Sequence, residues 1–261
     1  MPFITLISDW TKEDYYVGAV KGAIYSQLPD AKIVDLSHQV DRHNTTQAAF
    51  ILKSCYQRFP AGTVHIIGIR SQHAKGDYLV AKKDNQFFLA ADNGIFGLLF
   101  KEKPEEIIRL QLEKGNSPFP ELDIFASAAC RISEGEDLST LGEKLDDYYK
   151  NVPYRAIIED DTIIGKVLYI DSYENAITNI SRQIFERVGK GLPFRINMQY
   201  SQSQIRKLNT SYDETTPGEI LALFNSLDLL EIAQNGGEAS NMLNLNKDST
   251  VRVNFERKKK I

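Results

Sequence analysis

The chain has little cysteine, no excess of positive charge and no long hydrophobic run. Its 261 residues include two cysteines, Cys55 and Cys130, each in a segment patterned like a buried helix. This placement favours reduced core thiols over a disulfide or a metal site. The net charge of −4 argues against binding to nucleic acid through its phosphates.

Signals for export and for membrane insertion are also missing. No basic region followed by an apolar run opens the sequence, so it predicts no signal peptide. No stretch approaches the length of a membrane span. We therefore expect a cytoplasmic protein that has neither a membrane nor a nucleic acid as a partner.

Two common kinds of ligand site have no counterpart in the sequence. No glycine-rich loop follows the first apolar run, which argues against a nucleotide held by its phosphates. The histidines His38, His43, His65 and His73 are scattered and show no metal-binding spacing. We expect no metal and no cofactor, and we interpret His65, in the middle of a strand, as a satisfied core residue.

The first half of the chain alternates strand and helix patterns. This order is typical of a parallel sheet covered by helices, and it predicts a Rossmann-like α/β domain over 1–150 with a mostly parallel sheet. The segments at 78–82 and 86–90, joined by a polar turn, predict a hairpin. The expected strands lie at 3–8, 32–36, 63–69, 78–82, 86–90 and about 106–111. The expected helices lie at 17–26, 45–59 and about 123–134, with a further one that Asp92, Asn93 and Gly94 open and that runs through 100.

The pattern changes after a connector at 148–153. Short β-type runs separated by turns fill the rest of the chain, and helical periodicity is confined to 183–187. This spacing is typical of a small barrel or sandwich, so we predict an all-β, barrel-like domain over 151–261.

Three loops of the first domain follow expected strands, at 8–14, 36–43 and 70–77. Ligands of open parallel sheets bind beyond the carboxyl ends of the strands, where such loops meet. Asp9 ends the first strand, and its carboxylate suits the two hydroxyls of a vicinal diol. A cap of the next helix explains Asp9 equally well.

Six segments, in order along nearly the whole chain, resemble motifs of the SAM hydroxide adenosyltransferase and fluorinase superfamily. They read LISDW with DYYVGAVKG (6–22), PDAKIVDLSH (29–38), FPAGTVH (59–65), ADNG (91–94), IDSYENAITNI (170–180) and NSLDLLEIAQNGGEA (225–239). The resemblance implies an enzyme that binds S-adenosylmethionine between the first domain of one subunit and the β domain of its neighbour in a homotrimer. The implied reaction is a displacement at ribose C5′, in which water or a halide attacks and methionine leaves.

The same resemblance assigns ligand contacts to particular residues. Three of the matching residues also have structural explanations. Asp171 and Asn175 fit a tight turn, where Asp and Asn are common residue types. For Glu231, which also matches the family, the alternative is an outward-facing position in a β run. The implied contacts are Asp9 with the ribose hydroxyls, Asp14, Asp171 and Ser226 with the methionine amino and carboxylate groups, Tyr173 with the face of the adenine, and Asn175 and the backbone near Asn235 and Gly236 with its edge.

The sequence departs from the family where relatives position the attacking water with an Asp, an Arg and a His. Arg70 occupies the Asp position and Pro120 the His position, while the Arg position falls near Asp77 or Tyr78. The resemblance therefore implies a divergent member without the usual water-activating triad.

Three hypotheses follow from this departure. The first is hydrolysis of S-adenosylmethionine to adenosine and L-methionine, with His73, Asp77 or Glu121 as the substitute base. The second is a non-catalytic protein that binds S-adenosylmethionine or adenosine. The third is a displacement by an anion held at Arg70, although a surface ion pair explains Arg70 more simply.

One of these candidates and one neighbouring residue have further interpretations. His73 is the first candidate for the base because an unperturbed histidine is largely neutral at pH 7. A solvated loop histidine with no role explains it at least as well. We assign the one other side chain of these segments that could accept a proton, Asp123, to the N-cap of the following helix.

Overall fold

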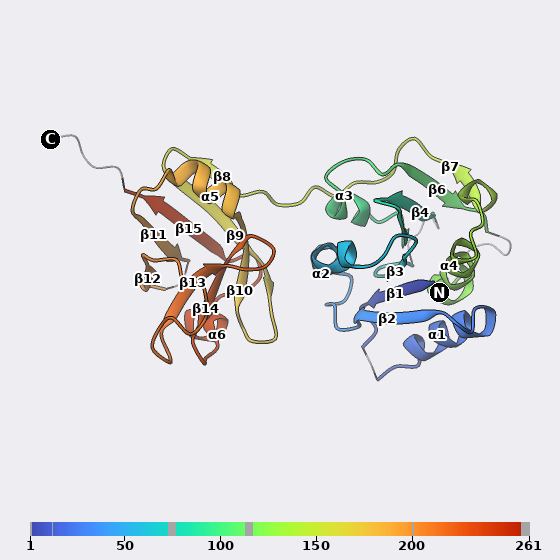
Figure 1. Ribbon diagram of the computed structural model, residues 1–261, viewed down its shortest axis with the longest axis horizontal. Coiled ribbons are helices and arrows are strands. Elements are labelled where there is room, and N and C mark those ends of the chain that lie inside the picture. The colour runs from blue at the N-terminus through green and yellow to red at the C-terminus, as the bar shows by residue number, and fades with distance from the viewer. Residues whose placement is uncertain (1, 12, 73–76, 113–116, 200, 257–261) are drawn as a thin grey trace. The chain divides into compact units, whose positions relative to one another are not determined.

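The computed structural model describes residues 2–11, 13–72, 77–112, 117–199 and 201–256 (Figure 1). The chain divides into two compact units, Met1–Pro153 and Tyr154–Ile261. His73, one of the candidate bases, lies outside the described residues.

The first unit is built on a seven-stranded mixed sheet. Its strand order is β2-β1-β3-β5-β4-β6-β7, in which β2, β1, β3 and β5 are parallel and the other neighbours are antiparallel. The expectation of a mostly parallel sheet is therefore not confirmed. The strands are β1 (Phe3–Ser8), β2 (Lys32–Ser37), β3 (Val64–Gly68), β4 (Tyr78–Lys83), β5 (Gln86–Ala91), β6 (Glu106–Leu110) and β7 (Gly142–Lys144).

The hairpin of β4 and β5 marks the change of direction. Asp84 and Asn85 at its turn both have positive φ, as a two-residue hairpin turn requires. Because β5 rather than β4 pairs with β3, the strand that follows β3 in the sequence runs antiparallel to its neighbours. The predicted hairpin is thus confirmed, and it accounts for the mixed sheet.

Helices cover both faces of this sheet. One apolar cluster joins Leu6 and Ile66 to α1 and α4, and the other joins Ile7 and Ile67 to α2 and α3. Successive strand residues point to opposite faces, so a strand buried on both faces reads as one continuous apolar run. The helices are α1 (Tyr16–Gln27), α2 (Thr45–Cys55), α3 (Ile95–Leu99) and α4 (Ala126–Ser133), with a π-helical turn, η2 (Glu121–Phe125), leading into α4.

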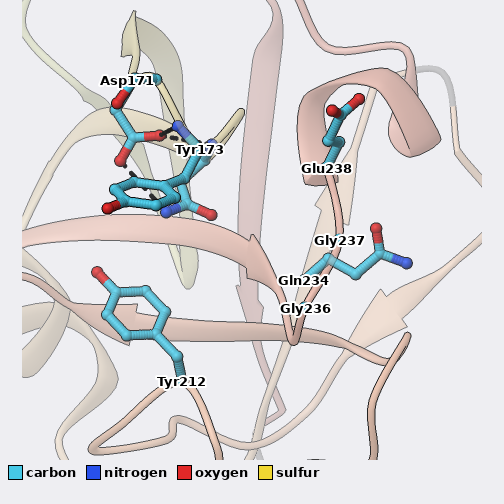
Figure 2. Close-up of a pocket in the computed structure, with 9 residues that line it drawn as sticks. Asp171, Tyr173, Tyr212, Gln234, Gly236, Gly237 and Glu238 are labelled. Atoms are coloured by element: carbon cyan, nitrogen blue, oxygen red, sulfur yellow. Dashed lines mark hydrogen bonds between the residues drawn. The ribbon is translucent and has the colours of Figure 1, made fainter.

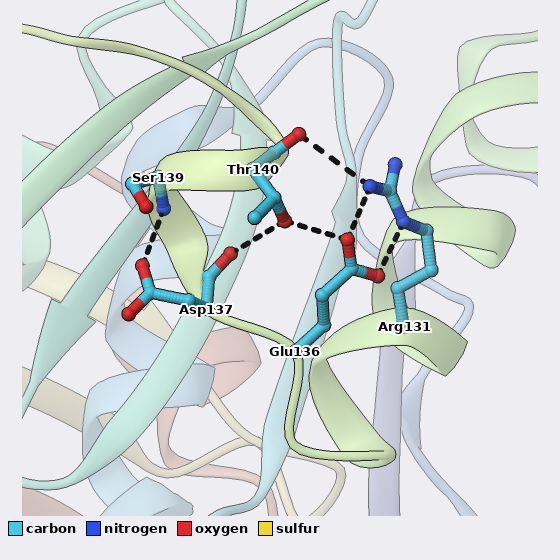
Figure 3. Close-up of polar contacts among 5 residues, drawn as sticks. All are labelled: Arg131, Glu136, Asp137, Ser139 and Thr140. Atoms are coloured by element: carbon cyan, nitrogen blue, oxygen red, sulfur yellow. Dashed lines mark hydrogen bonds and ion pairs between the residues drawn. The ribbon is translucent and has the colours of Figure 1, made fainter.

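A polar network ties the end of α4 to the segment that enters β7 (Figure 3). Arg131 donates to both carboxylate oxygens of Glu136, at 2.7 and 2.5 Å, and the Thr140 hydroxyl donates to the same carboxylate. These hydrogen bonds, Arg131 first, lower the pKa of Glu136 to about 2. The loop after α4 is therefore held by an ionised carboxylate across the whole physiological pH range.

The second unit is an antiparallel sheet that curls into a nearly closed barrel-like form. The order is β12-β11-β15-β9-β10-β14-β13, and β8 pairs with β9. A helix, α5 (Arg182–Gly189), covers it through Phe185, which meets Phe194, Phe224 and Phe255. The strands are β8 (Ile157–Glu159), β9 (Thr162–Ile170), β10 (Ala176–Ser181), β11 (Phe194–Met198), β12 (Gln204–Ile205), β13 (Ile220–Phe224), β14 (Leu229–Gln234) and β15 (Thr250–Phe255).

One short helix of this unit escaped prediction from the sequence. It is α6 (Ala239–Leu243), whose five residues are too few to show helical periodicity. In the part of the chain that the structure describes, no helix combines the length and the apolar character that a bilayer crossing requires.

Candidate functional site

The first group of site residues lies where β1 and β3 end side by side. Ser8 and Gly68 are paired in the register of these parallel strands. A Cβ on residue 68 would lie 2.6 Å from Trp10 Cζ2 and 3.1 Å from Glu121 Cγ. Both side chains therefore lie against the glycine, and its missing Cβ is what lets them approach the sheet.

The Trp10 indole is held by rings from three other segments. It stacks on His38 with a centroid separation of 6.4 Å and an interplanar angle of 9°. Phe119 meets it edge-on at 5.3 Å, and Tyr16 lies at 6.0 Å. His38 is itself buried, with its Nδ1 2.7 Å from Ser8 Oγ. The indole therefore has a defined position at the end of β1.

Asp9 is fixed by the loop that follows β2. Its Oδ2 accepts a hydrogen bond of 2.7 Å from the backbone N–H of His43. Helix α1 begins at Tyr16, and its N-cap residue is Tyr15, without a side-chain cap. The interpretation of Asp9 as a helix cap is therefore wrong, and its carboxylate stays at the carboxyl end of the sheet.

Glu121, in η2, brings a second carboxyl to this place. It is 3% exposed. Burial raises the pKa of Glu121 to about 7; the Ser71 hydroxyl and its own backbone N–H oppose the shift, and the charge of Asp9 adds to it. At neutral pH this buried carboxyl is thus close to half ionised.

The other residues proposed for catalysis have different surroundings. Asp77, before β4, lies 3.8 Å from Arg109, which also pairs with Glu143. Arg70 is exposed with φ +49°, and within the described ranges it makes no ion pair, so the simpler explanation for it is not observed.

Asp123 does not have the structural role that the sequence predicted for it. Its carboxylate accepts a hydrogen bond from the Ser117 hydroxyl. The helical segment already begins at Glu121, with Pro120 before it. The N-cap assignment of Asp123 is therefore wrong: it placed the start of the helix three residues late, because a π-turn precedes α4.

The second unit contains a pocket of about 720 Å³ (Figure 2). Four of the residues that the sequence proposed for ligand binding line it together: Asp171, Tyr173, Asn175 and Gly236. Figure 2 shows the Tyr173 and Tyr212 rings on one side and Glu238 on the other. The remaining lining residues are Ser172, Tyr212, Gln234, Gly237 and Glu238.

Asp171 and Asn175 form the turn between β9 and β10. Asp171 Oδ1 accepts from the backbone N–H groups of Tyr173 and Asn175, both at 2.9 Å, and its Oδ2 accepts from Asn175 Nδ2 at 3.2 Å. The turn interpretation is therefore correct, and the same residues also line the pocket. Asp171 acts here as the anchor that orients Asn175, while Tyr173 is left 76% exposed.

A buried carboxylate lies behind this pocket. Glu231 is 2% exposed and accepts from the Tyr212 hydroxyl at 2.8 Å and from Asn225 Nδ2 at 3.0 Å. Burial raises its pKa, against the effect of these two donors. The alternative of an outward-facing Glu231 is wrong. Its contact fixes the Tyr212 ring, a lining residue that no sequence pattern pointed to.

The remaining proposed ligand residues do not line this pocket. Asn235 donates its side-chain amide to the Thr215 carbonyl at 2.6 Å. Ser226 is exposed in the turn between β13 and β14. Asp14, in the first unit, is exposed and accepts from the Thr11 hydroxyl at 3.4 Å. Among the residues with described positions, no cluster of His, Cys, Asp and Glu could hold a metal ion.

Comparisons with known protein families match both units. Residues 4–142 match the SAM hydroxide adenosyltransferase N-terminal domain, and residues 165–252 match the SAM hydroxide adenosyltransferase C-terminal domain. Together these matches cover most of the chain.

Relatives of assigned function align over nearly their full length. An (R)-S-adenosyl-L-methionine hydrolase from Methanocaldococcus jannaschii is 28% identical, over 94% of this chain and 93% of its own. An (R)-S-adenosyl-L-methionine hydrolase from Thermus thermophilus is 26% identical, over 96% and 98%. A fluorinase from Nocardia brasiliensis is 24% identical, over 97% and 96%.

Solved structures share the fold. An uncharacterized conserved protein from Thermotoga maritima has a TM-score of 0.87 at 26% identity, covering 97% of this chain and 99% of that one. A conserved hypothetical protein from Thermus thermophilus has a TM-score of 0.73 at 23% identity, covering 97% and 100%.

Proposed function

Because the chain belongs to the SAM hydroxide adenosyltransferase family, we propose that it binds S-adenosylmethionine and hydrolyses it to adenosine and L-methionine. The observation that supports this most is the pocket of the second unit, which is lined by Asp171, Tyr173, Asn175 and Gly236, all from segments that resemble family motifs. Its volume of about 720 Å³ lies within the range of small-molecule sites, about 300–1,000 Å³.

The chemistry of the lining residues suits an adenosyl group. Tyrosine rings such as Tyr173 and Tyr212 offer flat apolar faces to a purine. The Asn175 amide has both a donor and an acceptor for the adenine edge, and Asp171 keeps this amide in place. In the first unit, Asp9 at the end of β1 is the carboxylate for the ribose hydroxyls.

We further propose that Asp14, Asp171 and Ser226 contact the methionine portion and that the active assembly is a homotrimer. The support is the order of the family motifs, which puts ligand residues in both units. A closed trimer repeats one heterologous interface three times. Light scattering should therefore give three times the 29.6 kDa monomer mass, and a monomeric mass would contradict the trimer.

The reaction needs little from the protein at the leaving group. The sulfonium of S-adenosylmethionine departs as a neutral thioether and requires no proton. The protein must align water with the C5′–sulfur bond and accept a proton from it. A site that aligns the substrate but lacks a proton acceptor would bind without turning over.

The direct test is to incubate the protein with S-adenosylmethionine and to follow adenosine and methionine by chromatography. We expect both products in equal amounts, with and without added halide. Asp9→Ala should weaken binding, measured as a smaller ligand-induced rise in melting temperature. Asp30→Ala, exposed before β2 and remote from the carboxyl ends, is the matched control. Absence of adenosine release above the uncatalysed rate would contradict the hydrolysis.

A further inference from the structure

Two carboxyl groups are buried in the described part of the chain, Glu231 in the second unit and Glu121 in the first. Glu231 is held by two side-chain donors, Tyr212 and Asn225. Around Glu121 the only described groups that favour the ionised form are the Ser71 hydroxyl and its own backbone N–H, and no cation contributes. A buried carboxylate without a cationic partner is costly, and such groups gather at functional sites.

The location of Glu121 agrees with a catalytic role. Its side chain lies against Gly68 and Trp10 at the joint carboxyl ends of β1 and β3, and its charge is coupled to that of Asp9. A ribose held through its hydroxyls at Asp9 has its C5′ one bond from the ring, in the same corner. The nucleophile that attacks C5′ must therefore stand at this end of the sheet.

Other candidates in this corner are less suited to accept a proton. Arg70 carries no proton-accepting group near neutral pH. Asp77 is about one-third exposed, and its Oδ1 lies 3.8 Å from Arg109 Nη1, so its carboxylate is open to solvent and paired with a cation. Among the described candidates, Glu121 alone combines burial, the absence of a cation and closeness to Asp9.

We propose that Glu121 is the general base that accepts a proton from the water attacking ribose C5′. This role rests on the proposed hydrolysis. It gives a base to a chain that lacks the Asp, Arg and His with which relatives position the attacking water. The water oxygen bonds to C5′ as the C5′–sulfur bond breaks, and the bonding pair stays on sulfur, giving the methionine thioether. One water proton passes to the Glu121 carboxylate and is later released to solvent.

The pH dependence follows from the groups around Glu121. Two of these groups titrate. The charge of Asp9 raises the pKa of Glu121, and the charge of Glu121 in turn raises the pKa of Tyr78 in β4. A base must be ionised to act, so kcat/KM, which reports the free enzyme, should rise with pH to a plateau, with a midpoint near pH 7.

The test compares kcat and KM between pH 5 and 9 for the wild type, Glu121→Gln, Glu121→Asp and Glu134→Gln, an exposed control at the end of α4. We expect Glu121→Gln to lower kcat by about 10²–10⁴-fold and to abolish the rise with pH, with KM within a few-fold. Glu121→Asp should keep the rise at reduced kcat, and Glu134→Gln should match the wild type.

The outcomes separate the two proposals. A wild-type kcat for Glu121→Gln would overturn the role of Glu121 and leave hydrolysis standing. So would a kcat/KM of the wild-type protein that does not change between pH 6 and 8. A wild type that binds S-adenosylmethionine but releases no adenosine would overturn the hydrolysis itself and the base with it. The ligand-induced rise in melting temperature of Glu121→Gln shows whether that variant is folded.

Discussion

Trp10 and Gly68 are packed so closely that a methyl group on residue 68 would lie 2.6 Å from Trp10 Cζ2. The indole rests directly on the backbone at the end of β3. We expect Gly68→Ala to lower the free energy of unfolding by about 1–3 kcal/mol, since overpacking forces the ring away. Trp10 is the only tryptophan of the chain, so its fluorescence reports this displacement directly.

A glycine in open space is the control for this variant. Gly18 of α1 is exposed, and a Cβ there would meet no atom within 4 Å. Gly18→Ala should stabilise the protein by up to about 1 kcal/mol, because alanine loses less backbone freedom in a helix. Unchanged stability and fluorescence in Gly68→Ala would show that the contact is not close.

Glu121 should make stability depend on pH in the opposite sense to an ordinary ion-paired carboxylate. Its pKa is raised to about 7 in the fold from 4.5, so the stability present below about pH 4.5 is lost as the pH rises through 7. The glutamine side chain of Glu121→Gln does not titrate. The free energy of unfolding of this variant should therefore exceed that of the wild type by roughly 3 kcal/mol at pH 8, with little difference at pH 4.5. Urea unfolding of both proteins at a series of pH values measures this difference. If the free energy of unfolding depended on pH in the same way for the variant and the wild type, the raised pKa would be refuted.

His65 should remain neutral under mildly acidic conditions. It is buried in β3 between Thr5 Oγ1 at 2.7 Å and Gln86 Oε1 at 2.6 Å, and burial lowers its pKa to about 4 against the effect of Gln86. Its neutral form stabilises the fold above about pH 6.5, and that contribution is lost as the pH falls towards 4. NMR titration of the imidazole signals, with His65→Asn to assign them, checks this. A midpoint near 6.5 would be inconsistent with the buried environment.

Tyr212→Phe should destabilise the second unit, because it removes one of the two donors to the buried Glu231. We expect a loss of about 1–3 kcal/mol, the cost of an under-satisfied buried polar group. Tyr173→Phe, on the exposed ring of the same pocket, should change stability by less than about 0.5 kcal/mol. Thermal unfolding of the two variants side by side gives the comparison; equal melting temperatures would mean that the Tyr212 hydroxyl contributes nothing.

Prediction from the sequence worked best where the signal is local. The polar turn at Asp84 and Asn85 indicated the hairpin, because positive φ at a two-residue turn is a property of those residues. The position of His65 in an apolar strand indicated a buried histidine, which the structure confirms. Prediction from the sequence failed at Asp123, because a π-turn before α4 leaves no distinct pattern of apolar residues in the sequence.

The sequence by itself determined the two-domain plan, the positions of the main strands and the family motifs, since apolar periodicity and turn residues act over a few neighbours. Only the tertiary structure decided that β5 rather than β4 follows β3 in the sheet, that Glu121 is buried beside Trp10, and that Tyr212 binds Glu231. Burial and pairing depend on segments that lie far apart in the chain. Asp9 and Glu121 come together because Asp9 follows the end of β1 and Glu121, the first residue of η2, packs against Gly68 at the end of the neighbouring strand β3.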